Sequence, residues 1–165
     1  MKFYTFLFIF YGILPLGYAM HRASIVAPLN DSNEWLSVSE NGIFQADPTI
    51  FYHDGYYYLY GTNGDSDQQL GFKVYKSRDL KHWQGPIGAK AGFALVKEDV
   101  FGSKGFWAPQ VWFEQGKFYM AYTADEKIAI AVSDSPIGPF KQDIPSTLIA
   151  GGKEIDPYVF RDKDG

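Results

Sequence analysis

Two aspartates stand directly before a proline, and their placement indicates shared chemistry. Of nineteen acidic residues, only Asp47 in "ADPTI" and Asp156 in "IDPYVF" do so. Proline restricts the preceding residue to extended conformations and is tolerated at the first position of a strand. We therefore expect both carboxylates at the starts of equivalent strands, where a pair brought to one site could transfer or control protons. The alternative is that each Asp-Pro only begins a turn.

An internal repeat supports this equivalence. Residues 46–62, "ADPTIFYHDGYYYLYGT", align without a gap with residues 107–123, "WAPQVWFEQGKFYMAYT", and a third copy begins at Ile155. In each full copy, β-branched and aromatic residues flank a polar turn containing glycine, which predicts a hairpin. A further strand, turn and strand are expected after each hairpin, over 71–83 and 128–140.

Units of about four antiparallel strands, repeated at roughly 50 residues, are typical of β-propeller blades. The alternative is a β-sandwich of unrelated hairpins. The spacing requires about 270 residues for a five-bladed propeller. We therefore expect residues 44–165 to be all-β and to hold about two blades plus the first strand of a third, as a truncated domain. If the repeated strands are innermost in their blades, Asp47 and Asp156 converge at one mouth of the central channel.

The motifs "ADPTI", "FWAPQV", "IDPYVF" and "SRDLKHW", in this order, resemble the opening blades of glycoside hydrolase family 43, whose members are five-bladed β-propeller enzymes. The resemblance covers residues 44–165. It implies an inverting glycoside hydrolase acting on O-glycosyl bonds in arabinose- or xylose-containing plant polysaccharides, such as arabinan, arabinoxylan or xylan. The alternative is a non-catalytic carbohydrate-binding propeller, or a degenerate remnant of such an enzyme.

The resemblance also implies roles for individual residues. Asp47 matches the general base, and Asp156 matches the aspartate that orients the general acid and raises its pKa by like-charge repulsion. The family supplies the general acid as a glutamate beyond the "IDP" motif. No glutamate in this chain occupies a matching motif, so we expect the 165-residue chain alone to be inactive. Trp107 is expected to contact the sugar, with blade packing as the alternative, and Phe44 is expected to help line the pocket.

No metal or cofactor is expected in this chain. It contains no cysteine, which excludes thiolate ligands and disulfides. The resemblance implies that a calcium or similar ion can occupy the channel of the complete propeller. Its histidine ligand, however, comes from a later blade.

Residues 1–19, "MKFYTFLFIFYGILPLGYA", have a basic start, an apolar run and small residues near the end, which predict a cleaved signal peptide. An uncleaved membrane anchor is the alternative. Residues 20–43 then lead into the propeller. We expect a periplasmic, cell-surface or extracellular protein with no membrane span after cleavage. The net charge of −4 is scattered along the chain, which argues against a nucleic-acid partner and leaves a polysaccharide as the expected one.

Overall fold

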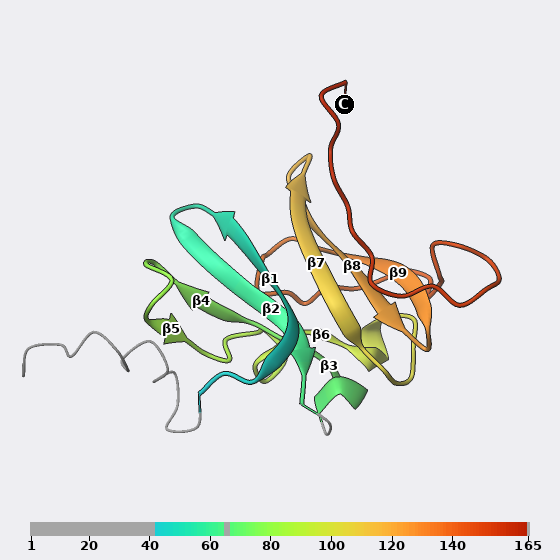
Figure 1. The fold of residues 1–165 in the computed structure, drawn as a ribbon, viewed down its shortest axis with the longest axis horizontal. Helices are drawn as coiled ribbons and strands as arrows, with labels where there is room; N and C mark the ends of the chain where they lie inside the picture. Colours follow the sequence, from blue (N-terminus) through green and yellow to red (C-terminus); the bar gives the residue numbers. More distant parts are fainter. Residues whose placement is uncertain (1–41, 65–66, 165) are drawn as a thin grey trace, which may run out of the picture. The chain divides into compact units, whose positions relative to one another are not determined.

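The computed structural model describes residues 42–64 and 67–164, so the expected signal peptide and most of segment 20–43 lie outside the described residues. The regular secondary structure of the described part is nine strands and two short 3-10 helices (Figure 1). None of its helices has the length and apolar character needed to cross a membrane. The elements in chain order are β1 (Gln45–His53), β2 (Tyr56–Asn63), η2 (Asp67–Gln69), β3 (Gly71–Lys73), β4 (Tyr75–Ser77), β5 (Trp83–Gln84), β6 (Phe93–Val96), η3 (Lys97–Asp99), β7 (Trp107–Glu114), β8 (Lys117–Ala124) and β9 (Lys127–Ser133).

The first unit is an antiparallel sheet in the order β1-β2-β4-β5. Its hairpin closes through Asp54 and Gly55, whose φ angles are +47° and +80°. Two central residues with positive φ form the turn that matches the twist of antiparallel strands, and Asp-Gly is a favoured pair for it. The polar turn recognised in the sequence therefore fixes where β1 ends.

The second unit repeats the first. Strands β7, β8 and β9 form its sheet, and an isolated bridge between Val132 and Lys141 takes the place of a fourth strand. Its hairpin closes through Gln115 and Gly116, at φ +49° and +79°. Strands β3 and β6 pair with each other as a separate two-stranded sheet. The sequence prediction of about four strands in each unit thus holds for the first sheet, whereas the second sheet has three strands and one isolated bridge.

The repeat extends to the hydrogen-bond register. In the first unit Ala46 pairs with Thr62, and the register then shifts before Thr49 pairs with Tyr60. In the second unit Trp107 pairs with Thr123, and the register shifts before Gln110 pairs with Ala121. Each residue in the two pairs of the second unit lies 61 positions after its counterpart in the first unit. Both hairpins therefore have a bulge at the equivalent place.

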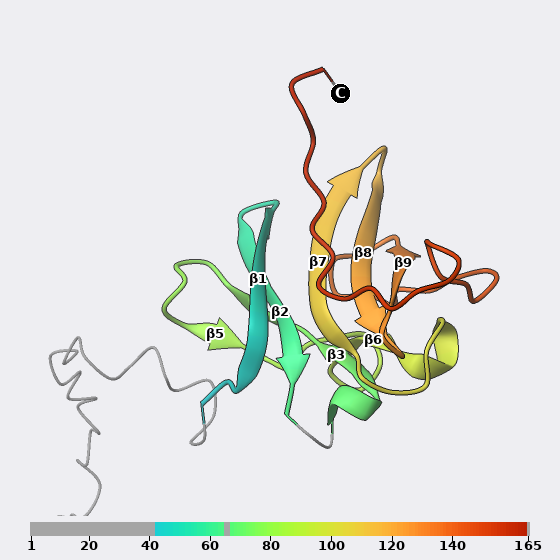
Figure 2. The ribbon, with the colours of Figure 1, turned by 45° about the vertical axis from the view of Figure 1, so that its right-hand side comes forward.

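The third copy lies beside β7 without forming a backbone ladder. Residues 153–162 have no regular secondary structure, and Figures 1 and 2 show this segment running along β7 in the same direction. The side chain of Gln110 holds it, since Nε2 donates to the Val159 carbonyl at 2.8 Å and Oε1 accepts from the Val159 N–H. The expected first strand of a third blade is therefore not formed as a strand in the described residues, and its segment is attached beside β7 through a side-chain amide.

Aromatic side chains dominate the core of the described residues. Phe72, Phe106 and Tyr122 are fully buried, and each ring centroid lies 5.9 Å from the other two. Phe51 on β1 contacts Phe118 on β8 edge to face at 6.0 Å. Burial of large apolar side chains, each contributing about 1.5–3 kcal/mol, holds the two units together and fixes their inner strands next to each other.

Candidate active site

Asp47 lies at the bulge of β1 in a left-handed conformation. Its φ is +46°, and the equivalent residues Ala108 and Asp156 have φ of +46° and +58°. The prediction that proline holds both aspartates extended is therefore wrong. Because the proline nitrogen has no hydrogen to give to the ladder, the pairing skips Asp47 and Pro48 and resumes at Thr49, within the same strand. The left-handed conformation costs a residue other than glycine about 1–2 kcal/mol, and Ala108 shows that all three copies use it.

The carboxylate of Asp47 is held by the neighbouring strand. Asp47 is exposed, and its Oδ2 accepts a hydrogen bond from Thr62 Oγ1 at 2.7 Å. Thr62 is buried on β2. Its Oγ1 also accepts a hydrogen bond from the backbone N–H of Ala108, at 2.9 Å. One hydroxyl thus joins the expected base to the start of β7.

Asp156 is attached in the corresponding way. Its backbone N–H donates to Thr123 Oγ1 at 3.0 Å. Thr123 is fully buried on β8, opposite Trp107 in the ladder. Asp47 and Ala108 therefore lie near the beginnings of β1 and β7, which Figure 2 shows at the same end of the two units, and Asp156 is attached near the end of β8 through Thr123. Both aspartates are exposed there, while their chemical roles stay predictions.

The two expected sugar-contacting aromatic residues lie beside these positions in the chain. Trp107 is half-buried at the start of β7, and Phe44, directly before β1, is 79% exposed. Gly105 has φ +62°, and a Cβ there would lie 3.0 Å from Cζ2 of Trp107. The indole thus packs closely over a backbone position that only glycine fits well. The binding roles of both aromatic residues also stay predictions.

The described residues offer no evident place for a metal ion. Within 42–64 and 67–164, no three His, Cys, Asp or Glu side chains gather as a metal site requires. Glu114 lies at the far end of β7 from Trp107 and pairs with Arg161, and Glu126 pairs with Lys153. The residues present do not fit the ion that the family resemblance implies, so no chemical step is derived through one.

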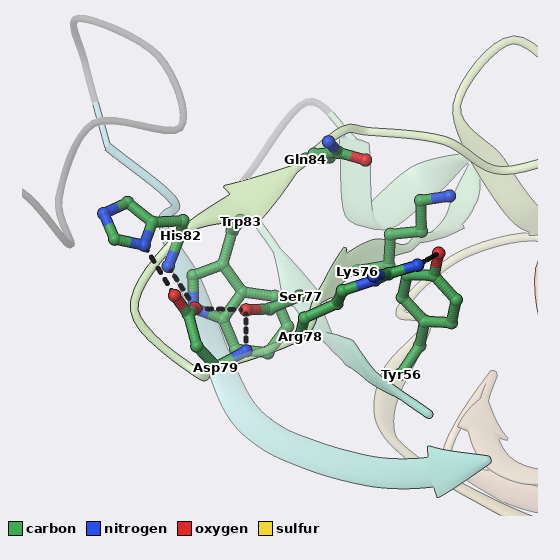
Figure 3. Close-up of a pocket in the computed structure, with 8 residues that line it drawn as sticks. All are labelled: Tyr56, Lys76, Ser77, Arg78, Asp79, His82, Trp83 and Gln84. Carbon is green, nitrogen blue, oxygen red and sulfur yellow. Dashed lines mark hydrogen bonds and ion pairs between the residues drawn. The ribbon is translucent and has the colours of Figure 1, made fainter. Parts of the chain in front are cut away.

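A separate hollow lies on the outer strands of the first unit, along the "SRDLKHW" stretch (Figure 3). It measures about 390 Å³ and is lined by Tyr56, Lys76, Ser77, Arg78, Asp79, His82, Trp83 and Gln84. Asp79 accepts hydrogen bonds from the backbone N–H groups of His82 and Lys81, and from His82 Nδ1. These bonds, led by the one from the His82 backbone, hold the pKa of Asp79 well below its usual range.

The cations beside that hollow pack on Tyr56. Arg78 Nη2 donates to the Tyr56 hydroxyl at 2.6 Å, and this bond lowers the pKa of the phenol. Arg78 Cζ lies 4.8 Å and Lys76 Nζ 5.0 Å from the centroid of the ring. The "SRDLKHW" stretch therefore builds a turn between outer strands, in which the side chains of Ser77, Arg78, Asp79 and His82 already have hydrogen-bond partners.

Sequence reasoning missed the two threonines that hold the bulges. Thr62 and Thr123 occupy equivalent positions at the ends of β2 and β8, and the repeat alignment already matched them. The signal that could have found them was a hydroxyl at the same place in both copies, in a strand otherwise rich in aromatic and aliphatic residues. Their importance depends on the left-handed turn at the bulge, which the sequence did not reveal.

The family model for glycosyl hydrolases family 43 matches residues 41–165. This chain belongs to that family. It is 34% identical over 138 residues to "Xylosidase/arabinosidase 43A" from Humicola insolens and 30% identical over 141 residues to "Xylosidase/arabinosidase" from Bacteroides ovatus. The alignments cover 74% and 75% of this chain and 42% of each relative. The chain thus spans about two fifths of the length of these curated relatives.

Solved structures agree with this assignment to family 43. An endo-1,4-beta-xylanase from Bacteroides thetaiotaomicron matches with a TM-score of 0.65 and 39% identity over 73% of this chain and 40% of that structure. An endo-arabinase from the same organism matches with a TM-score of 0.61 and 30% identity, over 74% of this chain and 43% of that structure. The all-β propeller class expected from the sequence is confirmed, and the two units are blades of a family 43 propeller.

Proposed function

We propose that the whole protein containing these blades is an inverting glycoside hydrolase acting on O-glycosyl bonds of xylose- or arabinose-containing polysaccharides. Membership of family 43 and the names of the relatives support this activity and substrate class. The observation that carries the proposal is the placement of Asp47. Its exposed carboxylate lies near the start of β1, an edge strand of the first sheet, and is held by a buried hydroxyl.

In the proposed mechanism, Asp47 takes a proton from the water molecule that attacks the anomeric carbon. A protonated carboxylic acid on the other side of the sugar gives its proton to the leaving oxygen, about 6.5–9.5 Å from the base. Asp156 lies near this acid and keeps it protonated by like-charge repulsion. The acid itself is a glutamate outside the described residues. Trp107 and Phe44 contact the sugar ring.

The test is Asp47→Asn in the whole protein, assayed on aryl β-D-xylopyranoside and aryl α-L-arabinofuranoside. The amide keeps the shape of the side chain and cannot take a proton, so we expect kcat to fall about 10²–10⁴-fold, the contribution of a general base. NMR of the first product should show inversion at the anomeric carbon. Asp143→Asn, at an exposed position, is the control. Undiminished turnover in Asp47→Asn would exclude this role.

Two further parts of the proposal have their own measurements. The 165-residue chain alone should not hydrolyse these glycosides, and turnover that Asp47→Asn abolishes would contradict this.

The predicted leader supports export to the periplasm, cell surface or exterior. Sequencing the N-terminus of the secreted protein should give Met20, whereas an intact leader in the cytoplasmic fraction would exclude export.

A further inference from the structure

The hydroxyl of Thr62 is the strongest feature that the proposed function has not used. It is buried between the two blades and takes part in two hydrogen bonds, one to Asp47 Oδ2 and one from the Ala108 N–H. A threonine hydroxyl has one hydrogen to donate. The Ala108 N–H occupies the acceptor side of the oxygen, because a backbone amide can only donate. The single hydroxyl hydrogen is therefore directed at the Asp47 carboxylate.

Asp47 depends on this contact to a large degree. Its side chain is exposed, and its backbone is in the left-handed bulge, outside the regular ladder. Among the described residues, Thr62 is the hydrogen-bond partner shown for its carboxylate. An exposed carboxylate without such a donor samples several side-chain rotamers, whereas a general base must hold its oxygen within hydrogen-bond reach of the water.

Comparison with the second blade distinguishes the contact by which Thr62 links the two copies from its contact with the proposed base. Thr123, the equivalent of Thr62, also accepts a backbone N–H from the next copy, in this case that of Asp156. The residue equivalent to Asp47 in the second blade is Ala108, which has no carboxylate to receive the hydroxyl hydrogen. Both threonines thus link adjacent copies, and only Thr62 adds a bond to an acid.

We propose that Thr62 is a positioning residue for the general base, holding the Asp47 carboxylate in its working orientation and linking that orientation to the start of β7. The inference rests on the proposed function, because it assigns Asp47 as the base. The Ala108 N–H of the second blade donates to Thr62 Oγ1 and so holds the hydroxyl in the position from which it donates to the Asp47 carboxylate. Displacement of a catalytic group by about 1 Å can cost about 10²-fold in rate.

The first test compares Thr62→Val with Thr62→Ser in the whole protein. Valine keeps the shape and removes both hydrogen bonds, so we expect kcat to fall about 10–100-fold while KM changes less than about threefold. Serine keeps the hydroxyl and should restore kcat to within about threefold of the wild type. A Thr62→Ser variant as slow as Thr62→Val, or a loss confined to KM, would overturn the proposal.

The second test is a double-mutant cycle with Asp47→Ala, since residues that act as a unit are not additive. In the Asp47→Ala background, Thr62→Val should change the residual kcat by less than about threefold. Thr123→Val is the matched control, because it removes an equivalent link between copies without touching Asp47. Because Thr123 holds the backbone of Asp156, which has its own proposed role in the reaction, this control is read from the melting temperature and not from kcat. Equal effects of Thr62→Val in both backgrounds would show a structural role only.

Thermal unfolding of the same variants gives a readout that does not need activity. The decrease in melting temperature of the double variant with Thr62→Val and Asp47→Ala should be smaller than the sum of the decreases in the two single variants. The decreases caused by Thr123→Val and Asp47→Ala should instead add. If the wild type hydrolyses no glycoside but this coupling is present, the proposed function fails and the contact stands. If hydrolysis is present and the coupling is absent, the positioning role of Thr62 fails alone.

Discussion

At the scale of single residues, the same backbone geometry serves both a catalytic candidate and a plain scaffold position. Asp47, Ala108 and Asp156 all have a left-handed φ before a proline, so this geometry belongs to the repeat and does not itself mark catalysis. The side chain that each copy carries at this place makes the difference. Two copies carry a carboxylate, and the copy between them carries a methyl group preceded by Trp107.

Trp107 gives a prediction at this scale. If its half-buried ring contacts the sugar, Trp107→Ala should raise KM about tenfold, a change of about 1.4 kcal/mol, with a smaller effect on the melting temperature. Steady-state kinetics and thermal unfolding of the whole protein measure the two effects. Trp112→Ala is the control, because Trp112 in the same strand stacks on Tyr119 at 5.3 Å and should affect melting more than KM. Parallel losses for both variants would favour blade packing as the role of Trp107.

At the scale of elements, the turn between β4 and β5 depends on one ionised carboxylate. Asp79 receives the N–H groups of two following residues, and its depressed pKa means that folding favours the charged form. Its stabilising effect is complete above the unfolded pKa, about 4, and is lost as the pH falls toward the lower folded value. The turn should therefore weaken on acidification.

The corresponding prediction compares Asp79→Asn with the wild type by differential scanning calorimetry. The variant should melt at a lower temperature at pH 7, because its neutral amide binds the two N–H groups less strongly than a carboxylate does. The difference in melting temperature between Asp79→Asn and the wild type should become smaller as the pH falls from about 5 to about 3. Asp143→Asn should show no such narrowing. A gap between Asp79→Asn and the wild type that is constant over this pH range would contradict the account.

The contact between β7 and the third copy gives another prediction. Gln110 both donates to and accepts from the backbone of Val159, so Gln110→Leu should remove the hydrogen bond that protects the Val159 amide. Hydrogen exchange over residues 155–160 should then be faster by about tenfold, while amides of β8 keep their rates. Gln110→Glu retains an acceptor for the Val159 N–H, so its exchange rate over residues 155–160 should lie between those of the wild type and Gln110→Leu. Unchanged exchange in Gln110→Leu would show that this segment is held in another way.

The sequence predicted elements whose signal is local and repeated. Asp54-Gly55 and its counterpart Gln115-Gly116 mark both hairpin turns, and the offset of 61 positions carries over into the register. The conformation before the prolines could not be predicted, because the steric rule describes an average residue before proline and not one in a bulge. The role of Thr62 was hidden for a related reason. Its partners lie 15 and 46 positions away and meet it only after the blades pack.

At the scale of the whole molecule, the faces of β1 differ in what covers them. Phe51 and His53 point toward the second blade, where they contact Phe118. Ile50 and Tyr52, which alternate with them along the strand, are 53% and 59% exposed. In a propeller, a neighbouring blade covers each face of an innermost strand. We therefore predict that the face of β1 carrying Ile50 and Tyr52 packs against a further blade in the whole protein.

This apolar face gives a prediction for the 165-residue chain in isolation. With Ile50 and Tyr52 uncovered, we expect the chain to bind a hydrophobic dye such as ANS and to associate at micromolar concentrations. Sedimentation measures the association, and Ile50→Lys combined with Tyr52→Lys should reduce it by placing charge on the face. In the whole protein the same pair of substitutions should instead lower the melting temperature, because the lysines would be forced under another blade. A monomeric isolated chain with a sharp, cooperative melt and no dye binding would show that this face needs no cover.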